Sequence, residues 1–199
     1  MKFEGGDSLL IEQLSFQTGE GGSTPTSPLQ LFVRPISKAT AAWCYRQWHY
    51  LKDTGFLHQY SFGAYYDGVI WGAITFHPPS APETVMGLFN STSQSSIYEI
   101  GRLAMDDRCP RNSESRFIAV AMRLLRKAVP VKAIITYADS AVGHTGTIYR
   151  ASGFTYLGLT DPKDDFWIDG KIQQRGKTRG MGGVWLSRSR KHKFIKRFD

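Results

Sequence analysis

The sequence predicts a single α/β domain in which helices cover both faces of a central mixed sheet. Strand-type and helix-type segments alternate along most of the chain. An Asp67-Gly68 pair separates two β-rich runs, as in a hairpin, and a nearly continuous apolar run at 131–138 is typical of a strand buried on both faces. The 199 residues can bury one sizeable core, and a second full domain is not expected.

The expected elements follow from the spacing of apolar residues and from turn-forming residues. In chain order they are a strand at 31–36, a helix at 38–49, a hairpin at 60–66 and 69–76, a strand at 97–105, a helix from Ser113 or Ser115 to about 127, a strand at 131–138, a short helix at 146–152 and a strand at 154–159. The segment 78–95, rich in Pro, Ser, Thr and Gly, is expected to form a loop or lid. Gly101, inside a predicted strand, indicates a bulge or the close approach of another backbone.

Both long helices show a stripe of apolar residues and a start or stop signal. Ser37 is a suitable N-cap for the first helix, and Gly153 stands where a glycine commonly ends a helix, directly after the short helix at 146–152. The apolar stripe of the first helix is Ala41, Cys44, Tyr45 and Trp48. The stripe of the second is Phe117, Val120, Ala121, Leu124 and Leu125.

Charge is concentrated at the C-terminal end. The net charge is +8, and residues 163–199 hold 11 Lys and Arg against 4 Asp and Glu. We therefore expect a flexible lead-in at 1–30, a catalytic domain at 31–162 and a basic extension at 163–199 that contacts DNA phosphates. The cations expected on DNA are Arg188, Arg190, Lys191, Lys193, Lys196 and Arg197. Two alternatives stay open: a solubilising tail, or a final strand with Phe194, Ile195 and Phe198 buried.

The composition points to the cytoplasm and away from a membrane. No apolar run approaches the roughly 18 residues that a membrane span requires, and the first 30 residues do not have the pattern of a secretory signal. The two cysteines, Cys44 and Cys109, are far apart and fit a reducing compartment.

Polar residues gather directly after two of the predicted strands, at the sheet edge where α/β proteins bind ligands. The segment 106–116 leads into a helix whose first N–H groups and dipole would accept a phosphate-bearing cofactor. The residues expected to bind it are Arg102, Arg111, Ser113, Ser115 and Arg116. No glycine lies between Met105 and Gly143, so the backbone cannot approach a phosphate as closely as a glycine loop does. The two serines could instead only cap the helix.

Two stretches carry a resemblance to a known family. They are Glu99…Arg102-Leu103…Pro110-Arg111-Asn112-Ser113-Glu114-Ser115 and Tyr137-Ala138-Asp139…Gly143-His144-Thr145-Gly146-Thr147-Ile148-Tyr149. Over about 31–158 the chain resembles the Mom DNA-modification proteins of Mu-like phages, which look like divergent members of the GNAT acetyltransferase superfamily. The resemblance implies conversion of adenine in duplex DNA to N6-carbamoylmethyl (acetamido) adenine, which protects phage DNA from host restriction. It also implies acetyl-CoA or a related acyl donor, and a bound iron, although the usual GNAT phosphate loop, Arg/Gln-x-x-Gly-x-Gly/Ala, is not kept here.

The catalytic residues are expected at these strand ends and at the end of the first helix. They are Asp139, Tyr149, His49, Tyr50 and Ser140. Asp139 could act as a general base, orient the adenine or bind a metal, and Tyr149 stands where GNAT enzymes often place the tyrosine that protonates a CoA thiolate. His49, Tyr50 and Asp139 together offer the nitrogen and oxygen ligands that suit iron or manganese. Each also has a structural interpretation: Asp139 as an N-cap, Tyr149 as a core residue and His49 as a cap or surface residue.

Chemistry on adenine N6 normally needs a flipped base, because N6 takes part in pairing. The alternative enzyme is a GNAT-type N-acetyltransferase that uses acetyl-CoA on a protein, a tRNA or a small-molecule amine, which leaves the basic segment unexplained. A different class is a nucleic-acid-binding module without catalysis. The sequence leaves the oligomeric state open, a homodimer included.

Overall fold

The computed structural model describes residues 23–52, 55–80, 82–90, 93–173 and 180–198. Most of the expected lead-in, residues 1–22, lies outside the described residues. In chain order the elements are η1 (Pro28–Gln30), β1 (Phe32–Pro35), α2 (Lys38–Trp48), β2 (Tyr60–Tyr66), β3 (Val69–His77), α3 (Pro82–Phe89), β4 (Ile97–Met105), α4 (Ser113–Ala128), β5 (Ala133–Asp139), η2 (Ser140–Val142), α5 (Thr147–Ala151), β6 (Thr155–Leu159), β7 (Asp164–Ile168), β8 (Lys171–Ile172), β9 (Val184–Ser187) and β10 (Lys191–Arg197).

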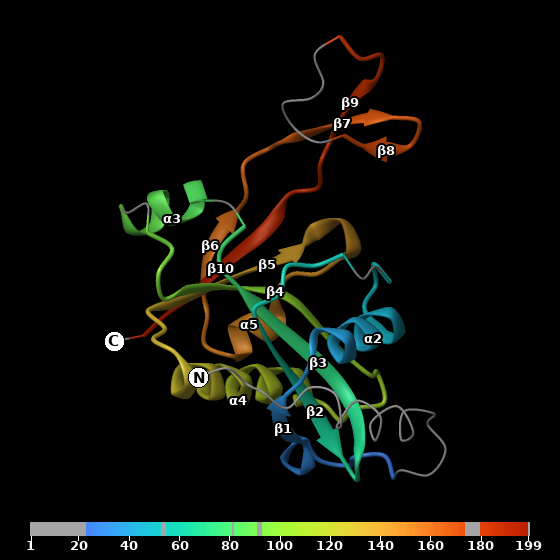
Figure 1. Ribbon diagram of the computed structural model, residues 1–199, viewed down its shortest axis with the longest axis vertical. Coiled ribbons are helices and arrows are strands. Elements are labelled where there is room, and N and C mark those ends of the chain that lie inside the picture. The colour runs from blue at the N-terminus through green and yellow to red at the C-terminus, as the bar shows by residue number, and fades with distance from the viewer. Residues whose placement is uncertain (1–22, 53–54, 81, 91–92, 174–179, 199) are drawn as a thin grey trace.

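A seven-stranded mixed sheet forms the centre of the protein, in the order β1-β2-β3-β4-β5-β10-β6 (Figure 1). Strands β4 and β5 are parallel, whereas the other neighbouring strands are antiparallel. This confirms the mixed sheet that the sequence predicts. The parallel pair is connected through α4, as a parallel crossover requires.

The hairpin and the first helix form where the sequence predicts them. Asp67 and Gly68 have φ angles of 49° and 75°, the positive values that a two-residue hairpin turn needs at both central positions. The side chain of Ser37 accepts a hydrogen bond from the Thr40 N–H at 3.1 Å and so caps α2. Strand β4 carries a register shift against β3 next to Gly101, which confirms the predicted bulge.

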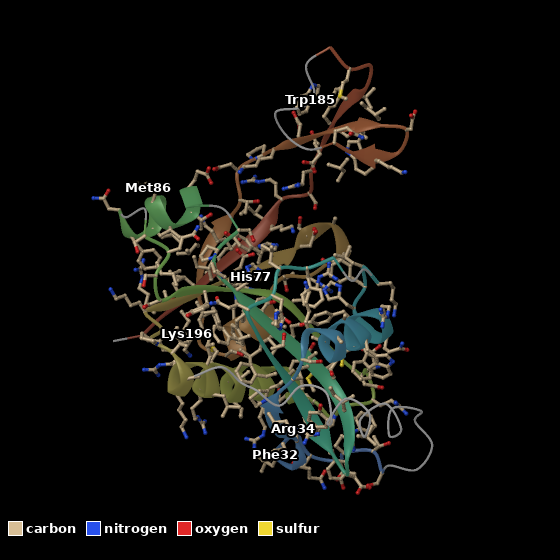
Figure 2. All side chains as sticks on the ribbon, viewed as in Figure 1. Phe32, Arg34, His77, Met86, Trp185 and Lys196 are labelled. Atoms are coloured by element: carbon tan, nitrogen blue, oxygen red, sulfur yellow. The ribbon has the colours of Figure 1, made fainter. Side chains whose placement is uncertain are left out.

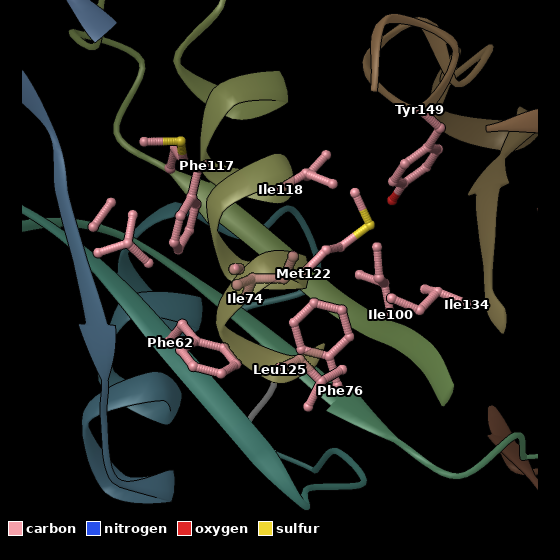
Figure 3. Close-up of a cluster of buried hydrophobic side chains, with 14 of the residues drawn as sticks. Phe62, Ile74, Phe76, Ile100, Phe117, Ile118, Met122, Leu125, Ile134 and Tyr149 are labelled. Atoms are coloured by element: carbon pink, nitrogen blue, oxygen red, sulfur yellow. The ribbon is translucent and has the colours of Figure 1, made fainter. Parts of the chain in front are cut away.

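Helices cover both faces of the sheet. Helix α4 packs against the largest core cluster, together with α5 (Figure 3). Its buried residues are Ser113, Phe117, Ile118, Ala121, Met122 and Leu125, so Val120 and Leu124 of the predicted stripe lie at its margin. Helix α2 packs with Ala73 and Ala104, whereas the neighbouring Ile74 and Met105 belong to the α4 cluster. Since successive strand residues point to opposite faces, α2 and α4 lie on opposite sides of the sheet.

The segment 78–95 is not the irregular loop that the sequence predicts, because it contains helix α3. Val85 is fully buried in this helix, in a third cluster with Ile97, Ile135 and Ile195. Leu88 and Phe89 pack against the same cluster. The apolar contact with the sheet stabilises a helix that local composition alone does not predict.

The C-terminal residues 188–198 are not an extension. Strand β10 lies inside the seven-stranded sheet, between β5 and β6. Phe194 is fully buried and Ile195 is 3% exposed, on opposite faces of the sheet. The boundary expected at 162 is therefore wrong: the catalytic domain includes β10, and the final-strand alternative is the one that the structure shows.

The segment between β6 and β10 stands apart from the body. Its strands form a small sheet in the order β8-β7-β9, which projects at the top of Figure 1. All four residues of β9 are exposed, and Trp185 is labelled on this sheet in Figure 2. Among the described residues, no helix combines the length and apolar character that crossing a membrane requires.

Candidate functional site

The parallel strands β4 and β5 separate in the middle of the sheet. Their pairing runs from Ile97 opposite Ala133 to Ile100 opposite Thr136. Both strands continue beyond these residues, and their described parts make no further pairs with each other. A gap therefore opens between the carboxyl-terminal halves of two neighbouring strands, the place where parallel sheets bind ligands.

A cavity of about 700 Å³ occupies this gap. Its lining comes from the end of α2 and the residues after it, from the separated halves of β4 and β5, from the end of β3, from 143–149 and from Lys191 of β10. A volume of this size lies within the range of roughly 300–1,000 Å³ of ligand sites. The expected residues His49, Tyr50, Arg102, Asp139 and Tyr149 all line this cavity.

The structure brings Asp139 to the same cavity as the neighbouring residues His49 and Tyr50, although Asp139 is far from them in the sequence. The His49 and Tyr50 rings are stacked with centroids 4.4 Å apart, and Tyr50 meets His144 edge-on at 5.4 Å. Burial raises the pKa of the Tyr50 phenol, and the charge of Asp139 raises this pKa further. Tyr50 therefore stays protonated near neutral pH and can donate a hydrogen bond to a ligand.

Asp139 and Ser140 have structural partners as well. The carboxylate of Asp139 accepts the N–H of Ala141 at 3.0 Å and caps the short helix η2, which is the structural alternative. It still lines the cavity, so the cap holds this carboxylate in place. The Ser140 hydroxyl donates to the Arg190 carbonyl at 2.6 Å, and Ser140 is not part of the cavity lining. Of these two residues, Asp139 therefore lies on the cavity wall, whereas Ser140 is bonded to the backbone beside β10.

Tyr149 is both a core residue and a wall of the cavity. It is 8% exposed, and its ring centroid lies 5.8 Å from Phe154 and 5.6 Å from Phe194. Desolvation raises the pKa of its phenol, while the Thr136 hydroxyl beside it lowers this pKa by a smaller amount. The phenol thus keeps its proton, and Figure 3 shows it pointing toward Met122 of the core.

The start of α4 differs from the anion-binding loop that the sequence suggests. Asn112 occupies the N-cap with φ 71°, in the left-handed region, and its side chain makes no capping bond. The hydroxyls of Ser113 and Ser115 donate to the carbonyls of Pro110 and Asn112, at 2.7 and 3.1 Å. A hydroxyl has one proton, so neither serine has a second proton to donate to a phosphate.

The cations around this loop are mostly engaged elsewhere or lie outside the cavity. Arg108 forms two bonds to the Asp106 carboxylate, at 2.9 and 2.7 Å. Arg111 and Arg116 are not among the lining residues, whereas Arg102 lines the cavity and donates to the Gly55 carbonyl at 3.0 Å.

Two acidic side chains, Asp107 and Glu114, line the cavity at the start of α4. Burial raises the pKa of Glu114, and the charge of Asp107 raises it further. Sequence reasoning did not assign them, and it also left His77 and Glu99 without a role, although both line the same cavity. No spacing signal could have found these four together, because they come from β3, from β4, from the loop after β4 and from α4.

The six cations expected on DNA have mixed positions. Lys191 lines the cavity and Lys193 is half-buried on β10. Arg188 forms an ion pair with Asp165 at 2.8 Å. The other three donate to backbone carbonyls: Arg190 to Thr160, Lys196 to Ser152 and Arg197 to Leu88. These three hydrogen bonds connect β10 and the residue before it to neighbouring segments.

The chain has the fold of GNAT acetyltransferases, as a comparison with solved structures shows. A putative acetyltransferase from Salmonella typhimurium, solved with its cofactor acetyl-CoA, superposes with a TM-score of 0.51 at 13% identity, over 85% of this chain and 95% of that one. A ribosomal-protein-alanine N-acetyltransferase from Brucella melitensis superposes with a TM-score of 0.51 at 14% identity, over 84% of this chain and all of that one (100%). These similarities show the fold.

The chain belongs to the Mom protein family, whose model matches residues 30–195. It is 28% identical over 137 residues to the methylcarbamoylase Mom of Escherichia phage Mu. That match covers 66% of this chain and 55% of the relative, so the chain spans about half the length of the curated relative. The family resemblance drawn from the two polar stretches is confirmed.

The GNAT fold implies coenzyme A, whose pyrophosphate would lie at the start of α4. The residues there do not fit this group. Asp107 and Glu114 place carboxyl groups on the cavity wall at the start of α4, where the two phosphates would lie. The residue with positive φ before this helix is Asn112 and not a glycine, so its side chain hinders a close approach of the backbone to a phosphate. Like charges facing each other in a binding site disfavour binding. No step is therefore derived through coenzyme A.

Iron is not supported by the donor set. The part of the chain that the structure describes contains no group of three or more His, Cys, Asp or Glu side chains placed to hold a metal ion. Tyr50 would have to join His49 and Asp139 as a phenolate to complete such a set. The Nδ1 atom of His49 also accepts the N–H of Leu51 at 3.2 Å.

Proposed function

We propose that this chain is a transferase that attaches a carbamoylmethyl group to N6 of adenine in duplex DNA. In this role it would act in the cytoplasm of a bacterial host and protect phage DNA from restriction. The observation that carries the proposal is the cavity between β4 and β5, in which His49, Tyr50 and Asp139 meet. Family membership, and the activity for which the phage Mu relative is named, support the type of group transferred.

The shape and composition of the cavity suit a flipped base. Aromatic rings line it from several sides, including Trp48, Tyr50, Phe56 and Tyr137. Flipped bases are held by stacking on such rings and by hydrogen bonds to their polar edge. The protonated phenol of Tyr50 and the carboxylate of Asp139 supply a donor and an acceptor for that edge.

Lys191 and Lys193 of β10 are the cations that we propose to contact the DNA backbone near the flipped base. Lys191 lines the cavity, and both residues pair with β5, opposite Asp139 and Tyr137. In contrast to Arg188, neither forms an ion pair with another of the described residues. Phosphate contacts here would position the duplex without reading its sequence.

The proposed function is tested by expressing the chain in a host whose DNA is unmodified and measuring its nucleosides by mass spectrometry. Deoxyadenosine carrying one carbamoylmethyl group is expected. Asp139→Asn, which keeps an oxygen to cap η2, should lower the modified fraction by about 10²-fold or more, the usual contribution of an acid–base group. Asp161→Asn, in an exposed position, is the matched control and should modify like the wild type. Unmodified DNA with the wild-type chain would refute the proposal.

DNA binding is tested by the salt dependence of affinity. Replacing Lys191 and Lys193 by alanine should make the slope of log K against log[salt] shallower by about 0.9 for each DNA phosphate that these lysines neutralise. Lys127→Ala, in the last turn of α4 and exposed, is the control and should leave the slope unchanged. Equal slopes for all three proteins would show that β10 does not contact DNA.

The second candidate function is an N-acetyltransferase, which the fold of the solved structures favours. Calorimetry with acetyl-CoA separates the two. We expect no measurable binding to the wild type, because Asp107 and Glu114 repel a pyrophosphate. The double variant Asp107→Asn, Glu114→Gln should gain affinity, whereas tight binding by the wild type would favour the acetyltransferase.

A further inference from the structure

His77, the last residue of β3, stands beside the gap between β4 and β5. It is 4% exposed and lines the cavity, and its partner across the β3–β4 pair is Glu99. Figure 2 shows the side chain near the centre of the molecule. A buried imidazole on a cavity wall is either a structural hydrogen-bond donor or a group that handles protons.

The two nitrogens of this ring have different surroundings. Nδ1 lies 2.6 Å from the carbonyl oxygen of Pro78. A carbonyl only accepts, so Nδ1 carries the proton and Nε2 holds the lone pair of the neutral ring. Among the described residues, none is hydrogen-bonded to Nε2.

Gly101 makes room for the ring. A Cβ atom at this position would lie 2.2 Å from Nε2 and 2.5 Å from Cδ2 of His77. Gly101 is also the bulged residue of β4, since Thr75 pairs with Arg102 and Phe76 with Ile100. Bulges next to active sites commonly redirect a side chain. Here the bulge and the missing Cβ together make room for the edge of the ring that carries Nε2, and Gly101 and His77 both line the cavity.

We propose that His77 is the general base of the reaction, accepting a proton at Nε2 from the amino group of the acceptor. This rests on the proposed function, in which the acceptor is adenine N6. The exocyclic amine is a weak nucleophile, because its lone pair is delocalised into the purine ring. Removing a proton as the new bond forms overcomes this, and an imidazole works best for such transfers near neutral pH.

The step balances with a carbamoylmethyl donor that bears a leaving group. The N6–carbon bond forms while the bond between that carbon and the leaving group breaks, and the leaving group departs with the electron pair of the broken bond. One N6 proton moves to Nε2, which gives an imidazolium. Nδ1–H remains bonded to the Pro78 carbonyl and so stabilises the new charge.

Charged and titratable groups on the neighbouring strands face the same cavity. They are Glu99 and Arg102 of β4, Tyr137 and Asp139 of β5, and Lys191 of β10. Glu99 accepts the N–H and the hydroxyl of Ser80, at 3.0 and 3.3 Å, which keeps this carboxylate beside His77.

The tautomer can be tested without any activity. Long-range proton–nitrogen NMR of the full chain, recorded where the imidazoles are neutral, shows which ring nitrogen carries the proton. We expect Nδ1–H for His77, assigned by comparison with His77→Asn. A neutral ring protonated at Nε2 would overturn the proposal, whether or not the chain modifies DNA.

The activity test uses His77→Asn and Gly101→Ala. The asparagine amide can still donate to the Pro78 carbonyl but is not basic, so folding and DNA affinity should be kept while the modification rate falls by about 10²–10⁴-fold. The acidic limb of the pH–rate profile should also disappear in this variant. Gly101→Ala keeps the imidazole but adds a Cβ that would lie 2.2 Å from Nε2, so the ring must move from its place on the cavity wall, and a similar loss of rate is expected.

The matched controls are His192→Asn and Gly87→Ala. His192 bonds to Tyr156 away from the cavity lining, and a Cβ at Gly87 meets nothing within 4 Å. Both should modify DNA like the wild type. A wild-type rate and pH profile in His77→Asn would refute the role of His77 as general base. If the wild-type chain does not modify DNA, the proposed function is refuted, and the NMR test then decides on the tautomer of His77.

Discussion

Replacing Phe194 by alanine tests whether β10 is part of the core. The side chain is fully buried, and its ring centroid lies 5.6 Å from Tyr149 and 5.2 Å from Tyr156. A Cβ at Gly146 would come within 2.3 Å of the ring, so the backbone packs closely against it. Truncating such a phenylalanine usually costs about 3–5 kcal/mol, a large part of the roughly 5–15 kcal/mol of a typical domain.

Urea unfolding followed by circular dichroism measures this loss. With an m-value of about 2–3 kcal/mol per molar urea, the midpoint should fall by about 1–2 M. Phe32→Ala is the matched control, because Phe32 is 67% exposed on β1 and its removal should change stability by less than about 0.5 kcal/mol. If both variants unfold at the same urea concentration, β10 is not a strand of the central sheet.

Three further predictions concern the strand β10, Gly146 and Asp106. Cutting the chain after Ser187 removes β10, so circular dichroism should show no cooperative unfolding; a sharp transition like that of the full chain would contradict this. Gly146→Ala should lower the free energy of unfolding by about 1–3 kcal/mol in urea titrations, because φ is 75° and the added Cβ meets Phe194, and an unchanged midpoint would argue against this packing. The hydrogen bonds from Arg108 lower the pKa of Asp106 in the folded protein. The ionised carboxylate therefore stabilises the fold fully above about pH 3.9, the pKa of an aspartate in the unfolded chain. This stabilisation is lost as the pH falls through the lower pKa of the folded state. Asp106→Asn should therefore be less stable than the wild type at neutral pH and approach it in acid, and a constant gap in urea titrations would count against the ion pair.

The sequence predicts the sheet well where one local signal decides the structure. The Asp67-Gly68 turn, the Ser37 cap and the apolar run of β5 each depend on residues next to each other in the chain, and all three are confirmed. The bulge at Gly101 is confirmed for the same reason. Helix α3 escapes prediction, because its stability comes from the contact of Val85 with distant strands.

The position of β10 shows why charge alone misleads. Its sequence interleaves cations with apolar residues, and this pattern fits both a basic arm and a strand. Packing in the sheet favours the strand, because Phe194 and Ile195 are buried in separate core clusters on its two faces. Lys196 then donates to the Ser152 carbonyl at 2.7 Å, so a cation expected on DNA stabilises the domain instead.

The candidate site was predicted in part. The gap between parallel strands brings together His49, Tyr50 and Asp139, which the family pattern and the strand ends indicated before the geometry was known. His77 has no such pattern around it. Its significance depends on Gly101, which lies on the next strand, and only the pairing of β3 with β4 brings the two together.

The walls of the gap and the start of α4 are separate parts of the candidate site. The separated halves of β4 and β5 form the walls of the cavity. Their positions depend on the β4–β5 pairing, which ends at Ile100, and on the bulge at Gly101, and not on the loop between β4 and α4. Asp107 of the loop before α4 and Glu114 in the first turn of α4 line the cavity here. If the proposed function holds, carboxyl groups at this place would disfavour a pyrophosphate and favour a neutral or cationic donor group. The acceptor side, with His77 and Asp139 on the strands themselves, does not depend on that loop.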